Sequence, residues 1–424
     1  MILRNLLYLA FPTLFSACQK QLAAPIPEMR WDLFGSPEAQ RVPVDAQNRM
    51  EGIYRVTEGS DLFGEEVVLK WTYLANGQDT TYHVSIFCEK NIAYMTGEGR
   101  LLNGSILLNM YWRTLVNTET GLTWITMSPE HGANLVNGGG EIGAESILIE
   151  GHFGRGQEQP GNKIALSYAR PLNPKPGFHV LAHRGGGRNA DQMPASENSV
   201  ELIRKATQLG ATGVEIDVKL TSDDMPVLYH DDNLNPRLVQ DVGLHGPIRE
   251  YSYAQLESLV RLVNGEKIPT LAQALHTIIH QTDLKYVWLD IKYEGPMEPV
   301  RAVQQEYVQV AQNLGRDVRI LIGLPGQDQV DKFLQLPDHQ NIPSLCEMSL
   351  DVVRQTNSEI WAPMWVMGQQ NGNVQEMQAE GRKVFVWTMD VAGFIQQYMY
   401  EGGYDGILSN FPSLVAYYHY TRPQ

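Results

Sequence analysis

Two carboxylates one residue apart stand between two histidines in the second half of the chain. Glu215 and Asp217 lie in the run GVEIDVKL, which follows His183 in AHRGGG and precedes His230 in PVLYHDD. Carboxylate oxygens are the ligands that hard divalent cations prefer, and histidine exchanges protons near neutral pH. These residue types indicate metal-assisted chemistry on a phosphate.

The geometry of a strand decides which of these side chains meet. Because successive strand residues point to opposite faces, Glu215 and Asp217 share one face and the branched apolar residues around them share the other. The same alternation in YVWLDIK puts Asp290 and Lys292 on the side of these acids. Three carboxylates from two strands, with water in the remaining positions, suit one Ca²⁺ or Mg²⁺, and no Cys/His spacing predicts zinc.

An ordinary structural explanation competes with the metal site. A half-exposed antiparallel strand with one wet face also alternates in this way. The surrounding order of strand, helix and strand instead predicts a parallel sheet covered on both faces, where paired acids need a cation. We therefore favour the metal site.

Each histidine also has an ordinary explanation, since a histidine at a strand end is more often a surface or core residue than a catalyst. His183 and His230 differ because each ends an apolar strand and lies beside Arg184 or Asp231. We expect no catalytic role for five other histidines of this half, which are His245, His276, His280, His339 and His419.

Several segments in order resemble the glycerophosphodiester phosphodiesterase family. They begin at about Gly177 and run to the C-terminus, and they read AHRGGG, ENS, GVEIDVKLTSDDMPVLYHDDNL, IPTL, LDIK, VFVWT and DGILSNFP. The resemblance implies that His183 and His230 are the general acid/base pair. It also implies that Arg184 and Lys292 contact the phosphate and that Trp387 lines the pocket.

The resemblance further implies that Glu215, Asp217 and Asp290 hold one divalent cation, with Glu197 of the ENS segment at the border of the site. Ser199 stands where the family usually has Thr. Asp290 stands where the family usually has Glu, one methylene longer. Related barrels of the sphingomyelinase D type use Asp at this strand, so the change keeps the metal site and leaves the substrate class open.

Three functions follow as hypotheses. The leading one is metal-dependent hydrolysis of a small anionic glycerophosphodiester to glycerol 3-phosphate and an alcohol, directly or through a cyclic phosphate. A second is a phospholipase D-like or phosphoinositide phosphodiesterase barrel acting on a lipid, which Asp290 favours. A catalytically silent binding protein is the third, and the presence of both histidines and all three acids argues against it.

The elements that position these residues alternate along residues 178–424. The runs FHVLAH, GVEIDVKL, PVLYH, YVWLDIK, VRILIG, KVFVWT and DGILS are typical of strands, with amphipathic stretches between them. Ser252 with Gln255, and Thr270 with Gln273, predict capping boxes that open two helices. The alternation predicts an α/β fold, a (β/α)₈ TIM-type barrel. Its sixth strand is ambiguous, because 342–347 and 359–365 both qualify and one could be an insertion.

The first half of the chain predicts a different architecture. Residues 46–170 hold about eight short alternating runs separated by turn residues, which predict an all-β antiparallel barrel or sandwich of unknown role. Its aromatic residues are expected to be core. The proline-rich residues 171–177 form the expected linker.

The N-terminus predicts export. Residues 1–17 have an early basic residue followed by an apolar stretch, as in a signal peptide, and Cys18 would then be lipidated, with residues 18–45 as a tether. The expected location is the bacterial cell envelope, lipid-anchored to a membrane outside the cytoplasm. Gln19 in place of Asp favours the outer membrane.

Composition limits the partners. A chain of 424 residues can bury two cores, and its formal net charge of −15 opposes binding to nucleic acid. Cys88 and Cys346 fall in different predicted domains, so we expect no disulfide between them. The sequence identifies no protein partner.

Overall fold

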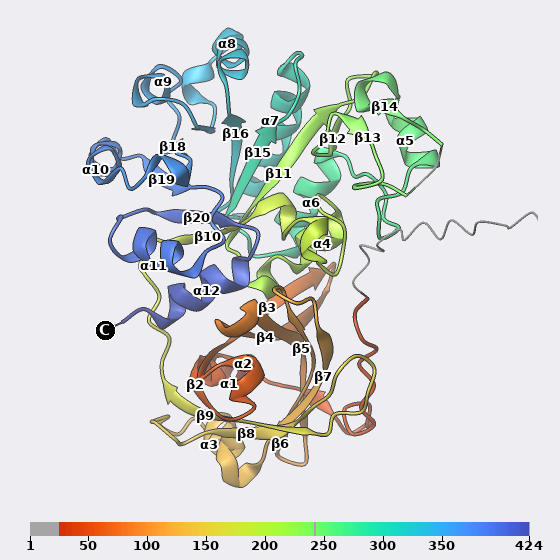
Figure 1. Cartoon of the computed structure of the whole chain (residues 1–424), viewed down its shortest axis with the longest axis vertical. Helices are drawn as coiled ribbons and strands as arrows, with labels where there is room; N and C mark the ends of the chain where they lie inside the picture. The colour runs from red at the N-terminus through yellow and green to blue at the C-terminus, as the bar shows by residue number, and fades with distance from the viewer. Residues whose placement is uncertain (1–24, 241–242, 424) are drawn as a thin grey trace, which may run out of the picture.

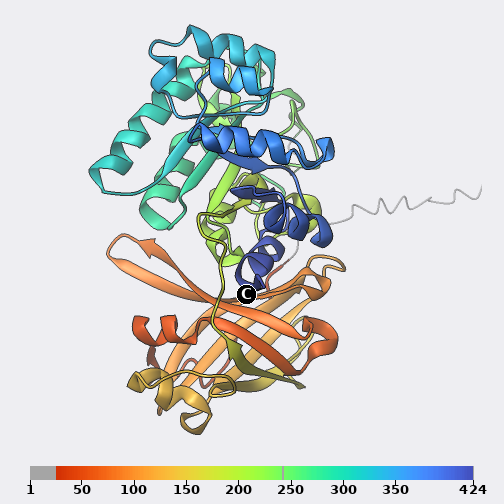
Figure 2. The same cartoon turned by 90° about the vertical axis from the view of Figure 1, so that its left-hand side faces the viewer.

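The chain folds into two stacked barrels in a computed structural model that describes residues 25–240 and 243–423. Figures 1 and 2 show the antiparallel barrel below and the parallel barrel above it. The expected signal peptide and Cys18 lie outside the described residues. Within those residues, no helix is both long and apolar enough to cross a membrane.

The N-terminal domain is a closed antiparallel barrel, which decides between the barrel and the sandwich that the sequence left open. Each strand pairs with the next along the chain, and β2 closes the ring on β9. A short strand, β1 (Gln40–Arg41), adds to β5, and three short helices accompany the barrel: α1 (Val44–Met50), α2 (Ser60–Phe63) and α3 (Asn134–Gly138). The strands are β2 (Gly52–Glu58), β3 (Glu66–Asn76), β4 (Asp79–Cys88), β5 (Ala93–Leu102), β6 (Ser105–Thr114), β7 (Thr120–Met127), β8 (Leu148–Phe153) and β9 (Asn162–Arg170).

Apolar side chains fill this barrel, as expected from its alternating strands. Trp112 is fully buried and meets Phe63 edge-on, with ring centroids 5.8 Å apart. Its indole N–H donates to the Gly154 carbonyl at 2.9 Å, so the one polar atom of the ring is satisfied. Cys88 is a free thiol buried in the same core.

The C-terminal domain is a closed barrel of parallel strands, and the predicted TIM-type fold is confirmed. The ring runs from β10 through β11 and β15 to β20, which returns to β10. Its strands are β10 (His179–Ala182), β11 (Gly213–Leu220), β15 (Tyr286–Ile291), β16 (Arg319–Leu324), β17 (Ser344–Cys346), β18 (Ile360–Trp361), β19 (Lys383–Val386) and β20 (Gly406–Ser409). The helices around it are α4 (Val200–Lys205), α6 (Leu271–Gln281), α7 (Glu298–Asn313), α8 (Gln327–Gln335), α9 (Leu350–Gln355), α10 (Asn371–Ala379), α11 (Ala392–Tyr400) and α12 (Pro412–Thr421).

Two details of the predicted strand order are wrong. The run PVLYH supplies β12 (Pro226–Leu228), which pairs antiparallel with the end of β11 and stands outside the ring. Both segments that competed for the sixth strand belong to the ring, as β17 and β18. The antiparallel pairing of β12 follows from the short turn at 221–225, which can reverse the chain but cannot hold a crossover helix. A small hairpin, β13 (Asn233–Leu234) with β14 (Gly246–Pro247), and α5 (Tyr253–Leu259) fill the insertion before α6.

Local sequence explains several helix starts. The side-chain hydroxyls of Ser252 and Thr270 each accept a hydrogen bond from the backbone N–H three residues later. In turn, the side chains of Gln255 and Gln273 accept one from the backbone N–H of Ser252 and Thr270, so both predicted capping boxes form. Ser199 likewise caps α4 by accepting from the Leu202 N–H at 3.1 Å.

An apolar cluster joins the two barrels. Phe87 on β4 belongs to the same cluster as Ala416 of α12, and Gly210 lies so close to both that a Cβ would sit 2.4 Å from the Ala416 Cβ. Arg113 of β6 is buried and donates to the Gln192 carbonyl at 2.7 Å. Gln192 lies in the loop after β10, so the β barrel directly supports a loop of the parallel barrel.

Candidate active site

The sequence-predicted acids lie on β11 and β15, whose carboxyl ends point away from the β barrel (Figure 1). Glu215 pairs in register with Trp288, and Asp217 pairs with Asp290. The apolar residues that alternate with them pack on the helices, as expected. Parallel barrels gather their functional side chains at this end.

Three carboxylates converge there. One oxygen from each of Glu215, Asp217 and Asp290 lies within 4.8 Å of the others, and all three side chains are buried. Within residues 25–240 and 243–423, Oε1 of Glu215 and Oδ1 of the two aspartates have no hydrogen-bond partner. Buried carboxylate oxygens without donors are unfavourable unless a cation fills the space, so this set fits one hard divalent ion.

Electrostatics agrees with that assignment. Burial, with Asp217 and Asp290 close by, raises the pKa of Glu215 well above its ordinary value. Burial also raises the pKa of Asp290, although Lys292 opposes the effect. Glu215 and Asp290 therefore bind a proton more tightly than exposed carboxylates do, and a cation between them would favour their ionised forms.

The other oxygens of these acids are held in place. Oε2 of Glu215 accepts from the Arg184 backbone N–H at 2.8 Å. Asn198 clamps Asp217 twice, donating to Oδ2 at 2.7 Å and accepting from its backbone N–H at 3.0 Å. Lys292 forms an ion pair with Asp290. Each acid thus has one oxygen held by the protein and one without a partner among the described residues.

Two backbone positions near the site have left-handed conformations. Arg184 has φ +53° and Asn198 has φ +60°, values that side chains other than glycine rarely adopt. The conformation of Arg184 presents its N–H to Glu215, and that of Asn198 brings its amide to Asp217. Strain of this kind is found where surrounding contacts demand a particular geometry.

His183 is oriented by two residues whose roles the sequence analysis missed. Asn410 donates its side-chain N–H to Asp390 at 2.6 Å, so its oxygen is the acceptor for Nδ1 of His183 at 2.6 Å. Nδ1 therefore carries the proton, and Nε2, 3.7 Å from Glu215 Oε2, carries the lone pair. Burial and the nearby Arg184 lower the pKa of His183 to about 4, which keeps it neutral at pH 7.

His230 has a different partner, the adjacent carboxylate. Its Nδ1 lies 2.6 Å from Oδ1 of Asp231, and Arg237 pairs with that same carboxylate. Burial alone would raise the pKa of Asp231, but the hydrogen bonds from Arg237 and His230 hold it below its ordinary value. The carboxylate at Nδ1 fixes the orientation of the imidazole ring. The segment adjoins the acids, since the Tyr229 N–H donates to the Asp217 carbonyl at 3.1 Å.

Glu197 joins the two halves of this arrangement. It is buried and accepts from Arg184 at 2.7 Å and from Arg237 at 3.1 Å. Asn189 adds its backbone N–H at 2.8 Å. The chain of contacts from His230 through Asp231 and Arg237 to Glu197 and Arg184 links both sides of the predicted site. Glu197 acts on the guanidinium groups and not as a member of the acid cluster.

Trp387 lies at the carboxyl end of β19, half-buried against the barrel interior. Its indole N–H donates to the Ala362 carbonyl at 2.8 Å, which fixes the ring. The polar atom is therefore used inside the protein, and Trp387 can offer a ligand only the surface of its ring.

Glu347 is a further acidic residue that the sequence analysis did not select. It follows β17 at the same end of the barrel, where burial and Asp290 raise its pKa to about 8. Asn198, Arg237, Asp390, Asn410 and Glu347 were missed because single amides and charges carry no spacing signal. The motifs ENS and DGILSNFP did contain two of them.

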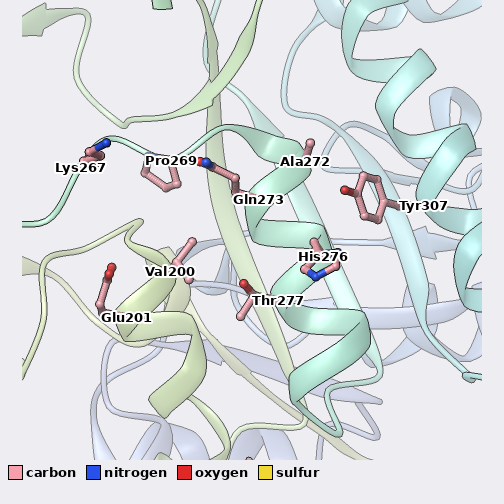
Figure 3. Close-up of a pocket in the computed structure, with 9 residues that line it drawn as sticks. All are labelled: Val200, Glu201, Lys267, Pro269, Ala272, Gln273, His276, Thr277 and Tyr307. Atoms are coloured by element: carbon pink, nitrogen blue, oxygen red, sulfur yellow. The ribbon is translucent and has the colours of Figure 1, made fainter. Parts of the chain in front are cut away.

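One cavity of about 470 Å³ lies outside this site. Figure 3 shows it between α4 and α6, with Val200 and Glu201 on one side, Gln273 and His276 on the other and Tyr307 of α7 nearby. None of the predicted site residues lines it. It is a groove between barrel helices and has no part in the chemistry described above.

Comparison with known proteins places these features in a family. Residues 183–414 match the model of the glycerophosphoryl diester phosphodiesterase family. Human glycerophosphodiester phosphodiesterase 1 is 30% identical over 152 residues, which are 34% of this chain and 43% of the human protein. The glycerophosphodiester phosphodiesterase of Caldanaerobacter subterraneus subsp. tengcongensis is 23% identical over 244 residues, 55% of this chain and 94% of that protein. The chain thus spans less than half the length of the human relative.

Two solved structures are also similar to part of this chain. A glycerophosphodiester phosphodiesterase from Parabacteroides distasonis is 22% identical with a TM-score of 0.47, covering 58% of this chain and all of that one. An Oleispira antarctica phosphodiesterase, solved with the product sn-glycerol-3-phosphate, is 24% identical with a TM-score of 0.46, covering 56% of this chain and 94% of the other.

Proposed function

Because the chain belongs to the glycerophosphoryl diester phosphodiesterase family, we propose that it hydrolyses glycerophosphodiesters to glycerol 3-phosphate and an alcohol with the help of one divalent cation, Ca²⁺ or Mg²⁺. One observation supports this most strongly. Three buried carboxylates lie close enough to hold one ion, and each has an oxygen without a partner among the described residues. His183 and His230 flank, in the sequence, the strand that carries two of them.

A phosphodiester requires two proton transfers. The attacking hydroxyl must lose a proton and the leaving alkoxide must gain one, so two imidazoles in opposite protonation states suit the reaction. His183 is neutral with its Nε2 lone pair free, which makes it the base. His230, with Asp231 against Nδ1, is the acid.

The reaction then balances as follows. An oxygen of water or of the neighbouring glycerol hydroxyl forms a bond to phosphorus and gives its proton to Nε2 of His183. The bond from phosphorus to the alcohol oxygen breaks, and that oxygen takes a proton from Nε2 of His230. A bound divalent cation would neutralise charge on the nonbridging oxygens. Arg184 and Lys292 add fixed positive charge on the phosphate.

Turnover of purified protein tests the proposal. Glycerophosphocholine and glycerophosphoethanolamine should release glycerol 3-phosphate, and chelator should abolish the reaction until Ca²⁺ or Mg²⁺ is restored. Phosphorus NMR of the early products distinguishes a cyclic phosphate from direct hydrolysis. Equal rates with and without chelator, in protein shown to be metal-free, would contradict the role of the acid cluster.

The second candidate function is attack on an acylated lipid by the same site. Asp290 favours it, and so do the exposed apolar side chains of Met364, Val366 and Met367 in the loop between β18 and α10. Large exposed apolar groups beside a site can contact lipid. A lysophospholipid turned over while glycerophosphocholine is untouched would decide for this candidate.

We also propose a cellular location for the protein. The N-terminal pattern favours lipidation at Cys18 and attachment to a membrane of the bacterial envelope, outside the cytoplasm and preferably the outer membrane. Labelling with a radioactive fatty acid should mark the wild type and not Cys18→Ala. That variant should also leave the membrane fraction, and an unlabelled wild type would refute the anchor.

A further inference from the structure

Three neighbouring strand ends of the parallel barrel bring Asp390, Asn410 and His183 together. β10 and β20 pair in register up to their last residues, which places the residues that follow, His183 and Asn410, side by side. On the other side of β20, the Met389 N–H donates to the Leu408 carbonyl at 2.9 Å and holds the chain before Asp390 against this strand. Strand pairing therefore sets the contact between the three side chains.

The two oxygens of Asp390 accept from different donors. Oδ1 accepts from the backbone N–H of Asn410 at 2.8 Å and from the hydroxyl of Ser409 at 2.9 Å. Oδ2 accepts from the side-chain amide of Asn410 at 2.6 Å. Ser409 and Asn410 are both buried. Because a carboxylate can only accept, Asp390 holds the NH₂ group of the amide toward itself and leaves the amide oxygen directed at His183.

The orientation of this amide decides which nitrogen of His183 carries the proton. Oδ1 of Asn410 lies 2.6 Å from Nδ1 of His183. A neutral imidazole has a proton on one of its two nitrogens, and only a protonated Nδ1 can donate to an oxygen. Nε2 then has the lone pair, on the side where Glu215 lies. A reversed amide would offer an N–H to Nδ1 and favour the proton on Nε2.

We propose that Asp390 is a positioning residue that keeps the proton of His183 on Nδ1 and thereby leaves Nε2 free to act as the base. The inference rests on the proposed function, because it concerns the base of that reaction. Asp390 acts through Asn410, so its role is to hold an amide and not to touch the substrate. In serine proteases, an aspartate that fixes the histidine tautomer contributes about 10⁴ to kcat.

Asp390→Asn should reverse the amide while keeping the shape of the side chain. The backbone N–H of Asn410 can only donate, so the oxygen of the new side chain takes the place of Oδ1. Its NH₂ group then replaces Oδ2 and meets the NH₂ group of Asn410. Two donors cannot pair, so the Asn410 amide rotates, its NH₂ group faces Nδ1 of His183, and the proton moves to Nε2.

The kinetic test compares two conservative variants. Asp390→Asn should lower kcat for glycerophosphocholine about 10²–10⁴-fold, with little change in KM or in melting temperature. Asp405→Asn is the matched control, because Asp405 is also half-buried and accepts a backbone N–H, from Val384 at 2.8 Å, at the other end of the barrel. It should keep full activity. A fully active Asp390→Asn would overturn the inference.

A reciprocal double variant distinguishes positioning from a merely structural role. When Asp390→Asn is combined with Asn410→Asp, the carboxylate at position 410 accepts both from the new amide and from Nδ1 of His183, which restores the original tautomer. We expect kcat to recover at least about tenfold over the single variant, as for other contacting pairs. Rates are compared at about pH 8.5, well above the ordinary pKa of histidine at ~6.5. A folded double variant as slow as Asp390→Asn would contradict the inference.

The tautomer itself can be observed without turnover. In protein labelled with ¹⁵N at histidine, proton–nitrogen correlation spectra distinguish a proton on Nδ1 from one on Nε2, and the signals missing from His183→Gln identify this residue. With Ca²⁺ or Mg²⁺ present, the proton should be on Nδ1 in the wild type and the double variant, and on Nε2 in Asp390→Asn. A wild type with the proton on Nε2 would refute the inference even if no variant folds.

The outcomes separate the inference from the function on which it rests. If the wild type turns over no diester but the spectra give the expected tautomers, the proposed function fails and the action of Asp390 on His183 stands. If diesters are turned over and Asp390→Asn keeps its rate, the function stands and the role of Asp390 is refuted. A slow Asp390→Asn with the proton still on Nδ1 would also refute that role, because its loss of activity would have another cause.

Discussion

Both barrels of this chain have an apolar interior, and the parallel barrel also has charged side chains toward one end. The antiparallel barrel is packed with apolar side chains, among them Trp112 and Phe63. The parallel barrel has an apolar interior too, with Leu181, Trp288 and Phe385. Above that layer come Glu215, Asp217, Asp290 and other charged groups, which have no counterpart inside the described part of the β barrel.

Strand direction accounts for the difference. In a parallel barrel every strand ends on the same side, so the residues after all eight strands meet at one mouth. In an antiparallel up-and-down barrel, the strand ends are divided between two rims. The three acids and both histidines therefore need only occur near the ends of consecutive strands to come together.

The largest expected effect is a loss of activity with no change in stability. His230→Ala should lower kcat/KM by about 10²–10⁴, the usual contribution of a general acid, with an unchanged melting temperature. His276→Ala, on the exposed face of α6, is the matched control and should retain full activity. Steady-state kinetics and thermal melts of both variants check this, and a fully active His230→Ala would remove this residue from the mechanism.

A variant in the β barrel should have the opposite effect, a loss of stability with no change in activity. Trp112→Ala leaves a cavity beside Phe63 and removes a buried hydrogen bond, so we expect a loss of about 3–5 kcal/mol in the free energy of unfolding. Activity per folded molecule should stay near the wild-type value. Denaturant unfolding measures the loss of stability, and steady-state kinetics at denaturant concentrations where the variant is still folded measure its activity. Loss of kcat in fully folded protein would show that the β barrel takes part in chemistry.

A smaller effect is expected from a positioning residue. Arg237 connects Asp231 with Glu197, so Arg237→Met should lower kcat about 10–100-fold, as for other supporting contacts around a reactive group. Arg237→Lys keeps the charge without the planar fork and should recover part of the loss. Arg249→Met, an exposed pair with Asp224, is the control. A merely structural role would lower stability in Arg237→Met without changing the pH profile.

The smallest effect is on stability as a function of pH. Since burial raises the pKa of Glu215, the folded protein binds a proton there that the unfolded chain releases near its ordinary pKa. Stability in chelator should therefore fall as pH rises above that ordinary value, with a slope of at most about 1.4 kcal/mol per pH unit for one proton. Below about pH 6.5, buried histidines such as His83 act in the opposite direction, because burial lowers its pKa to about 4.

The window from pH 6.5 to 8 isolates the acid effect. Melting temperatures in chelator should decline across it, and Glu215→Gln should flatten the decline. Added Ca²⁺ or Mg²⁺ should stabilise the wild type more at pH 8 than at pH 6.5. A wild type whose stability rises throughout this range would contradict the raised pKa.

What the sequence could predict was local. The alternation in GVEIDVKL and YVWLDIK is complete within each strand, so the acids and the faces they occupy followed from the pattern alone. The sixth strand was ambiguous because β18 contributes only Ile360 and Trp361, too few residues for alternation to appear. Closure of the β barrel depends on β2 meeting β9, a pairing across more than a hundred residues that leaves no local signal.

The supporting residues of the site were beyond the sequence for a related reason. Asn198 and Asn410 matter because of what their amides face, Asp217 in one case and His183 in the other. Nothing in the chemistry of an amide singles it out in a sequence. Its role depends on the partner that it faces, and in both cases another strand supplies that partner. Glu215, Asp217 and Asp290 were found because carboxylates are rare in a covered strand; the amides were not.

Arg113 bears on how this molecule can be engineered. Its buried guanidinium reaches from the β barrel to the Gln192 carbonyl, in the loop that leads to Glu197. Cutting the chain at residues 171–177 to obtain a stand-alone enzyme would remove that donor and uncover the surface around Gly210. We therefore expect each barrel to be less stable when separated from the other. A design that uses the parallel barrel alone has to replace the hydrogen bond from Arg113 to the Gln192 carbonyl.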